Sequence, residues 1–139
     1  MPRIKYKKAP DVCCLAGRII SQGYFSHVKK DRIWCLSSWG AKTKAIARIH
    51  GLSSAWIAIG LEPGYIIEVI GEKFYSLSFE EQVKTVIHEL LHIPYTFSGG
   101  LRPHGRLVNS RRVNTIYRKL SLDKLKDCYC ISSIKQGGL

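Results

Sequence analysis

The sequence predicts an α+β fold in which a mixed, twisted sheet packs on helices. Three observations carry this prediction: apolar residues at helical spacing over 11–22, a β-branched run at Tyr65–Ile70, and a well-delimited amphipathic segment over 78–92. At 139 residues with 45% hydrophobic content, the chain is long enough to bury a core as one domain, 1–139, without metal or disulfide staples.

The N-terminal part is expected to begin with a basic tail at residues 1–9. A helix from about Asp11 to Gln22 follows, because five apolar residues recur there at helical spacing, and Gly23 is the expected stop. These five residues are Val12, Leu15, Ala16, Ile19 and Ile20.

The next stretch is richer in strand signals. Arg32–Leu36 and Lys44–His50 are candidate strands, while Ser53–Ile59 fits either a strand or a short helix. Tyr65–Ile70 is the clearest strand because four of its six residues are β-branched. A turn after it would bring Lys73–Ser76 back as a hairpin partner.

A second helix is well delimited at both ends. Ser78 followed by Glu81 fits a capping box, and Glu80 also suits the positive end of the helix dipole. Pro94 cannot continue a helix, so this one should end near His92. Its apolar stripe consists of Val83, Val86, Ile87, Leu90 and Leu91.

A glycine- and serine-rich loop, Tyr95–Pro103, leads to a last helix at about Arg106–Lys119, and residues 121–139 are hard to assign. In the last helix, the residues expected to be buried are Val113, Ile116, Tyr117 and Leu120. Those expected in solvent are Arg111, Arg112, Arg118 and Lys119. The core is also expected to contain Trp34, Trp39 and Trp56.

The net charge of +12 is unevenly distributed. Residues 1–50 carry eleven Lys or Arg against two Asp, residues 51–101 two Lys against six Glu, and residues 102–139 nine Lys or Arg against two Asp. Basic flanks attract phosphate backbones, but no nucleic-acid-binding motif accompanies them. We therefore interpret them first as solvated surface and leave nucleic acid open as a partner.

The five cysteines contain no C-x-x-C pair, so a structural four-ligand zinc knuckle is not expected. They are Cys13, Cys14, Cys35, Cys128 and Cys130. No apolar stretch has the length of a signal peptide core or a membrane span. A cytoplasmic protein without membrane contact, with thiols mostly buried as small hydrophobic groups, is the expectation.

His88-Glu89-Leu90-Leu91-His92 forms an H-E-x-x-H pattern inside the second predicted helix. Residues four apart lie one turn apart, so both imidazoles project from one face and can share a metal ion. Glu89 lies on the shoulder of that face, where a carboxylate can act as general base toward a zinc-bound water, whose pKa is lowered to about 7. The position after a strand and before a helix breaker strengthens the pattern.

A catalytic zinc needs a third protein ligand. No Glu follows Glu89, and the only Met is Met1, so the thermolysin and metzincin patterns are absent. His104 is the favoured third ligand, because it lies beyond a Ser-Gly-Gly segment that can fold the chain back. The alternatives left open are Asp123, Asp127, Cys128 and Cys130.

For other residues, the sequence gives weaker arguments for a role at the metal site. No spacing argument makes His27 or His50 a ligand, and each is interpreted as a surface or satisfied core histidine. Arg102, Tyr95 and Tyr117 are candidates to stabilise an oxyanion, and packing explains each equally well.

The segment from Ile87 to Gly105, with Ile-His-Glu-Leu-Leu-His-Ile-Pro followed by Phe-Ser-Gly-Gly-Leu-Arg-Pro-His-Gly, resembles a family of small metallopeptidases from archaea and phages. Ala45–Gly51 and Tyr65–Ile70 are also similar to it. That family is zincin-like. The resemblance implies a sheet stacked on the active-site helix. From the periodicities above, the sheet is also expected to pack on the N-terminal helix, with a further C-terminal helix.

The same resemblance implies that His88, His92 and His104 bind one zinc ion, with Glu89 as the catalytic base. In zincins a strand before the active-site helix borders the cleft and pairs with the extended substrate. Tyr65–Ile70 or Lys73–Ser76 would have that role here.

The function expected is therefore a zinc-dependent metallopeptidase acting on a peptide or protein substrate. Two alternatives stay open. One is a basic, nucleic-acid-associated protein on a zincin fold, and the other is a zinc hydrolase of non-peptide bonds.

Overall fold

A computed structural model, which describes residues 3–126 and 128, has a four-stranded mixed sheet. The strands are β1 (Lys5–Lys8), β2 (Ile33–Trp39), β3 (Ala47–Gly51) and β4 (Tyr65–Ile70). Their spatial order is β1-β2-β4-β3, with β2 and β4 parallel and the two outer pairs antiparallel. The predicted α+β class with a mixed sheet is confirmed.

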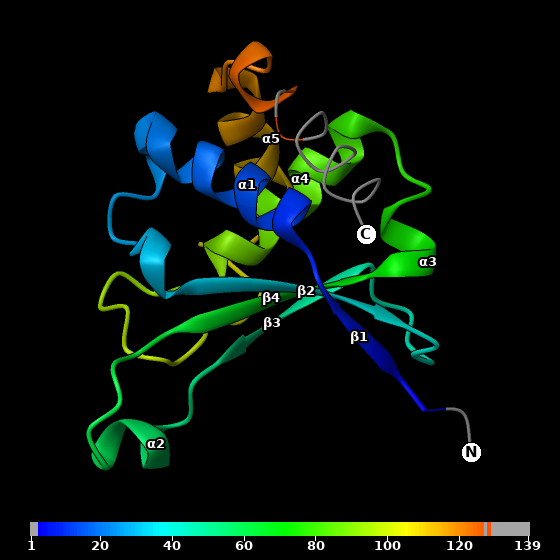
Figure 1. The fold of residues 1–139 in the computed structure, drawn as a ribbon. Coiled ribbons are helices and arrows are strands. Elements are labelled where there is room, and N and C mark those ends of the chain that lie inside the picture. Colours follow the sequence, from blue (N-terminus) through cyan, green and yellow to red (C-terminus); the bar gives the residue numbers. More distant parts are fainter. Residues whose placement is uncertain (1–2, 127, 129–139) are drawn as a thin grey trace.

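Three helices cover one face of this sheet (Figure 1). They are α1 (Pro10–Ile19), α4 (Phe79–Leu91) and α5 (Ser110–Lys119). A π-helical turn, η1 (Ile20–Tyr24), extends α1, and a 3-10 turn, η2 (Lys30–Arg32), precedes β2. The short helices α2 (Ser54–Ala58) and α3 (Gly71–Phe74) flank β4 in sequence.

The core lies between the sheet and α1 and α4. Leu15 and Ile19 of α1, Ile87 and Leu90 of α4, and Ile67 of β4 are all fully buried. The predicted apolar stripe of α4 is buried along its whole length. Burial of this stripe fixes which face of α4 points away from the sheet core, and so where its polar side chains can project.

Two predicted segments differ from the structure. Lys5–Lys8 lies in the predicted tail but pairs with β2 as an edge strand. Lys73–Ser76 was predicted as a hairpin strand, which is wrong, because β4 already pairs on both sides. The chain turns instead into α3, where Gly71 lies against the Trp39 ring so closely that a Cβ would overlap it. The ambiguous Ser53–Ile59 forms helix α2.

The predicted burial of the tryptophans is wrong for Trp34 and Trp56, which are exposed, while Trp39 is half-buried and stacks on Tyr75. The last helix begins at Ser110, not Arg106. The side chain of Asn109 accepts the Arg112 backbone N–H at 2.9 Å and so defines the N-cap.

The expectation of reduced thiols is wrong for one pair, because Cys14 of α1 and Cys128 form a disulfide with Cα atoms 5.6 Å apart. Cys13 and Cys35 are free, and Cys130 lies outside the described residues. Over residues 3–126 and 128, no helix is both long and apolar enough to cross a bilayer.

Candidate metal centre

Helix α4 positions the three residues of the H-E-x-x-H pattern. Its start is fixed by the Ser78 hydroxyl, which accepts the Glu81 backbone N–H at 3.2 Å as the capping box requires. It ends at Leu91, one residue before the predicted end. His88 and His92 thus lie one turn apart, with ring centroids separated by 5.1 Å.

The loop after α4 returns His104 to these two rings. Its ring centroid lies 5.0 Å from that of His88 and 4.7 Å from that of His92. The Nε2 atoms of His88 and His104 are 2.9 Å apart, and one nitrogen from each of the three rings lies within 4.8 Å of the other two. The structure therefore brings together the three imidazoles that the sequence analysis grouped.

Arg102 holds this loop against the end of α4. Its backbone N–H donates to the His92 carbonyl at 2.7 Å. Its guanidinium donates to the Leu91 carbonyl from Nε at 3.1 Å and from a terminal nitrogen at 2.9 Å, and lies 4.7 Å from the Tyr95 ring centroid. Carbonyls at a helix end lack partners within the helix, so Arg102 satisfies them while fixing the loop.

A second anchor comes from the sheet. The Tyr65 hydroxyl on β4 donates to the Gly100 carbonyl and accepts the Gly99 N–H, both at 2.8 Å. Gly51 of β3 lies so near the loop that a Cβ there would overlap the Gly99 carbonyl. The loop that carries His104 is thus tied to both the helix and the sheet.

Burial of His88 and His92 favours their neutral form. His92 Nδ1–H donates to the Arg102 carbonyl at 2.6 Å, which leaves Nε2 free. Burial lowers the pKa of His88 to about 4, with contributions from His92 and His104, and burial also lowers the pKa of His92. Metal ions bind neutral imidazole, so the lowered pKa values of His88 and His92 favour metal binding near neutral pH.

Glu89 is the buried carboxyl beside this cluster, with 5% of its surface exposed. Burial raises its pKa to about 7. It lines a cleft of about 810 Å³ together with His88, His92 and His104. The rest of the lining comes from residues 44–49, α4 and α5, and from Leu101.

The strand that borders the cleft is not the one expected. Residues 44–49, which include the start of β3, line it, whereas Tyr65–Ile70 lies inside the sheet between β2 and β3. Lys73–Ser76 does not line it either. Because β3 is an edge strand, its position beside α4 follows from the strand order, which no local sequence pattern specifies.

The remaining candidates lie elsewhere. Among the residues that the structure describes, Asp123 is exposed, with a carboxylate oxygen 3.8 Å from the Lys126 amine nitrogen. Cys128 is bonded to Cys14 in the disulfide. Asp127 and Cys130 fall outside the described residues. His27 donates to the Ile93 carbonyl at 3.1 Å, and His50 donates to Glu68 at 2.7 Å.

None of the three oxyanion candidates lines the cleft. Tyr95 and Arg102 pack on each other, and the Tyr117 hydroxyl contacts Glu80 at 3.5 Å. Ser110 and Asn114 of α5 line the cleft instead, and neither was predicted as a site residue. No spacing relates them to the H-E-x-x-H pattern, since only the packing of α5 on α4 places them there.

Comparison with known proteins agrees with this geometry. No curated protein and no solved structure matches the chain. One family model, described as "putative phage metallopeptidase", matches residues 4–127, which include every element named above. The chain belongs to this phage metallopeptidase family, whose name implies a metal ion and peptidase activity.

Proposed function

We propose that this protein is a zinc-dependent metallopeptidase with His88, His92 and His104 as metal ligands and Glu89 as general base. The observation that carries the proposal is the convergence of three imidazoles beside a buried carboxyl in an open cleft. A zincin-like arrangement, with the sheet stacked on the helix that bears the motif, is part of this proposal.

The donor set fits zinc. Two nitrogens bound to a tetrahedral zinc at about 2.0–2.1 Å lie about 3.3 Å apart, close to the 2.9 Å between His88 and His104. Three imidazoles complete a catalytic set that keeps the fourth position open. When bound, zinc would supply Lewis-acid polarisation of the scissile carbonyl and acidify a water molecule.

Glu89 is suited to move the proton. A carboxylate with a pKa near the working pH both accepts and releases a proton readily, and burial raises the pKa of Glu89 to about 7. A dication at the three imidazoles would lower that pKa again. Glu89 would take the proton of the attacking water and deliver it to the leaving amine.

The outer edge of β3 is suited to hold the substrate. In the described part of the chain, β3 pairs only with β4, so its other edge faces the cleft without a strand partner. An extended peptide can add to such an edge through main-chain hydrogen bonds. The proposal thus assigns to Ala47–Gly51 the pairing with an extended substrate that was expected of Tyr65–Ile70 or Lys73–Ser76.

A matched pair of substitutions on α4 tests the base. We expect Glu89→Gln to retain zinc and lose at least a hundredfold in the rate of casein or labelled-peptide hydrolysis. Glu80→Gln, an exposed carboxyl on the same helix, should behave as wild type. Equal hydrolysis by Glu89→Gln and wild type would overturn the role of Glu89.

Metal content tests the ligand set separately. Wild-type protein should hold one zinc per chain by elemental analysis, and His104→Ala should lose most of it while His27→Ala keeps it. Zinc retained by a folded His104→Ala variant would show that another donor completes the site.

A further inference from the structure

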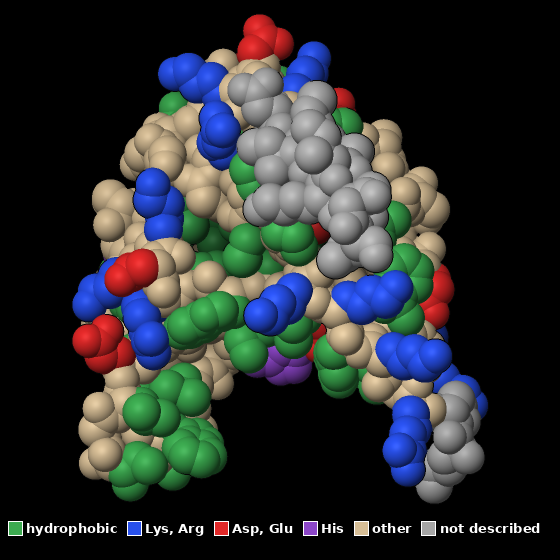
Figure 2. Space-filling view, viewed as in Figure 1, with side chains coloured by type: hydrophobic (Ala, Val, Ile, Leu, Met, Phe, Trp, Pro, Cys, Tyr) green, Lys and Arg blue, Asp and Glu red, His purple; other side chains and the backbone are tan. Residues whose placement is uncertain are grey.

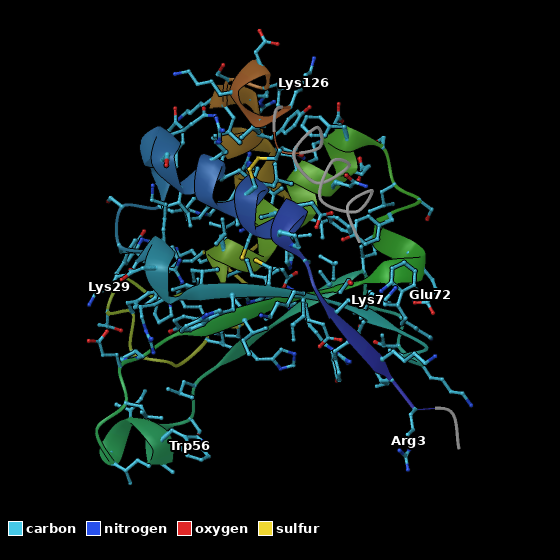
Figure 3. All side chains as sticks on the ribbon, in the orientation of Figure 1. Arg3, Lys7, Lys29, Trp56, Glu72 and Lys126 are labelled. Atoms are coloured by element: carbon cyan, nitrogen blue, oxygen red, sulfur yellow. A yellow bond between two sulfur atoms is a disulfide. The ribbon has the colours of Figure 1, made fainter. Side chains whose placement is uncertain are left out.

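The sheet face opposite α1, α4 and α5 has no element packed over it in the described residues. In Figure 1, α2 and the N-terminal end of β1 extend beyond this face at its two ends. Figure 2 shows that the molecular surface is hollowed between them. Trp56 on α2 and Arg3 before β1 lie at the two sides of this hollow in Figure 3.

The strand register identifies the side chains on this face. Cross-strand partners share a face of the sheet, and neighbours along a strand alternate between faces. Ile33, Cys35 and Ile67 are buried toward the helices, so the residues between them point the other way. We call this surface the open sheet face, which includes Tyr6, Lys8, Trp34, Leu36, Arg48, His50, Ile66 and Glu68.

Large aromatic rings are exposed on and beside the open sheet face. Tyr6 is 55% exposed, Trp34 45%, and Trp56 of the flanking α2 54%. The Trp34 ring lies against Gly64 so closely that a Cβ there would overlap it, and the Arg32 guanidinium is 4.7 Å from the ring centroid. Trp34 is therefore held in place while much of its surface stays in solvent.

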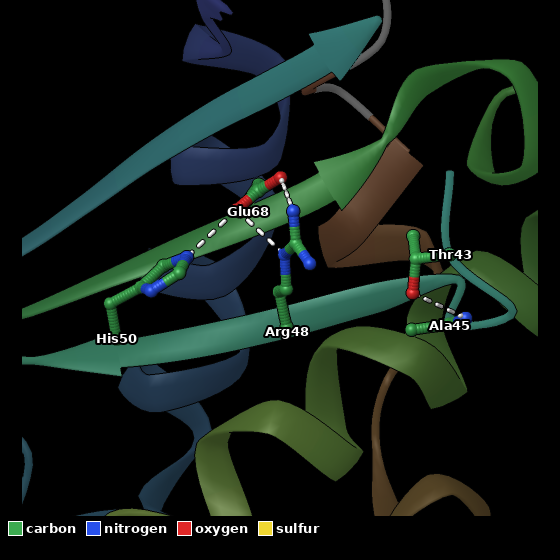
Figure 4. A network of polar contacts seen from close by, with 5 residues as sticks. All are labelled: Thr43, Ala45, Arg48, His50 and Glu68. Atoms are coloured by element: carbon green, nitrogen blue, oxygen red, sulfur yellow. Dashed lines mark hydrogen bonds and ion pairs between the residues drawn. The ribbon is translucent and has the colours of Figure 1, made fainter. Parts of the chain in front are cut away.

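The charged groups of the open sheet face are predominantly cationic. Residues 3–8 contain no carboxylate, and their four Lys or Arg are exposed. Lys8 lies on the open sheet face and Arg3 beside its hollow (Figure 3), whereas Lys5 and Lys7 pair with Trp39 and Ser37 and so lie on the other face. Glu68, the carboxyl in the middle of the face, is buried beneath Arg48, at 3.0 and 3.1 Å, and His50, at 2.7 Å (Figure 4). Glu62 lies 3.8 Å from Arg32 at the Trp34 end.

From this combination we propose that the open sheet face binds single-stranded nucleic acid, with bases stacked on Trp34 and Tyr6 and phosphates on Arg3 and Lys8. Proteins that bind single strands combine a cationic surface with exposed aromatic side chains, because every base offers a π-face. A four-stranded sheet with exposed aromatics is one such surface. A second copy of this chain would bring like charges together on this face.

Helix α5 is the rival basic surface. It exposes Arg111, Arg118 and Lys119, but its aromatic residue, Tyr117, is half-buried, with Lys84 5.0 Å from the ring centroid. Cations without free rings favour phosphate contacts alone. The aromatic rings therefore distinguish the open sheet face from α5.

The test is fluorescence anisotropy of a labelled 20-nucleotide oligothymidine titrated with the full chain at several salt concentrations. We expect Trp34→Ala to weaken binding about tenfold, as loss of one stacked base requires, with Trp34→Phe restoring most of it. Tyr24→Ala, which removes an exposed ring outside this face, should bind as wild type. Circular dichroism would establish that each variant is folded.

Charge is tested by a matched pair of double variants. Arg3→Ala with Lys8→Ala should lower the slope of log K against log salt by about 1.4, since each single-strand phosphate contact contributes about 0.7. Arg118→Ala with Lys119→Ala on α5 should leave the slope unchanged. His104→Ala should bind the oligonucleotide like wild type, which separates this proposal from the peptidase proposal.

Three results would overturn the proposal. One is the absence of binding at low salt. Another is a loss of affinity in the Arg118 and Lys119 variant as large as in the Arg3 and Lys8 variant. The third is a Trp34→Ala variant that binds the oligonucleotide like wild type but sediments differently from wild type in its absence. That result would identify the open sheet face as a contact between copies of the chain.

Discussion

His92 and Arg102 are joined by two reciprocal hydrogen bonds, His92 Nδ1 to the Arg102 carbonyl at 2.6 Å and the Arg102 N–H to the His92 carbonyl at 2.7 Å. The first bond fixes the tautomer of His92 and leaves Nε2 available. The second ties the loop that carries His104 to the end of α4. In the proposed metal site, a backbone carbonyl would thus take the place of the carboxylate that often orients a ligating histidine.

We expect Arg102→Ala to weaken zinc binding by about tenfold or more. The backbone bonds remain possible, but loss of the guanidinium frees the Leu91 carbonyl and the Tyr95 ring, so the loop is less well fixed. Competition with a chelator measures the change. Arg106→Ala, at an exposed residue of the same loop, is the control, and equal affinities for the two variants would contradict this role.

Gly51→Ala should destabilise the protein by about 1–3 kcal/mol, because its methyl group would overlap the Gly99 carbonyl and displace the loop. Zinc affinity should fall as well, since His104 belongs to that loop. Gly17→Ala on α1 is the matched control. The nearest atom to its Cβ would be 4.0 Å away, so it should stabilise slightly. Urea unfolding distinguishes the two, and similar midpoints would refute the close packing.

Acid should weaken the sheet through Glu68. Burial acts to raise its pKa, but hydrogen bonds from Arg48 and His50 outweigh it and hold the pKa at about 2, below the ordinary 4.5. As pH falls, the unfolded chain therefore binds the proton at a higher pH than the folded chain does. The contribution of ionised Glu68 to the free energy of unfolding is complete above pH 4.5 and is lost as pH falls toward 2.

The loss amounts to at most about 3 kcal/mol, from 1.36 kcal/mol per pKa unit. Stability measured by urea unfolding between pH 5 and 2 should decline less steeply in Glu68→Gln than in wild type. An unchanged slope in that variant would assign the acid sensitivity to other carboxyl groups.

The disulfide between Cys14 and Cys128 closes a loop of 114 residues in sequence separation. Such a link restricts the unfolded chain, so its reduction should cost about 2–4 kcal/mol. Thermal unfolding with and without dithiothreitol measures this, and Cys14→Ser should match the reduced protein and no longer respond to reductant. A wild-type melting temperature indifferent to reductant would argue against a stabilising disulfide.

Local patterns predicted the part of the site that lies on α4. The Ser78 cap, the apolar stripe and Pro94 all act within a few residues of the positions they affect, so the helix and the one-turn spacing of His88 and His92 follow from sequence. The strand Tyr65–Ile70 was predicted with its observed bounds for the same reason, since its β-branched residues suit a strand in any fold.

Other features depend on contacts between distant segments. The exposure of Trp34 follows from its position on a sheet face that no helix within residues 3–126 covers. The identity of β3 as the strand at the cleft follows from the strand order. Neither feature can be predicted from residue spacing. The alternation of a strand indicates that one face is apolar, but it does not indicate which strand or helix lies next to it.

An H-E-x-x-H pattern on one helix, and a third histidine proposed to complete a metal site, could be predicted from local spacing alone. The meeting of His104 with the other two rings depends on long-range contacts. The hydrogen bonds that hold its loop come from Arg102 to the helix end and from Tyr65, which lies 34 and 35 residues before the loop glycines. Helix geometry is set by neighbours in the chain, whereas the closure of this loop depends on which surfaces pack together.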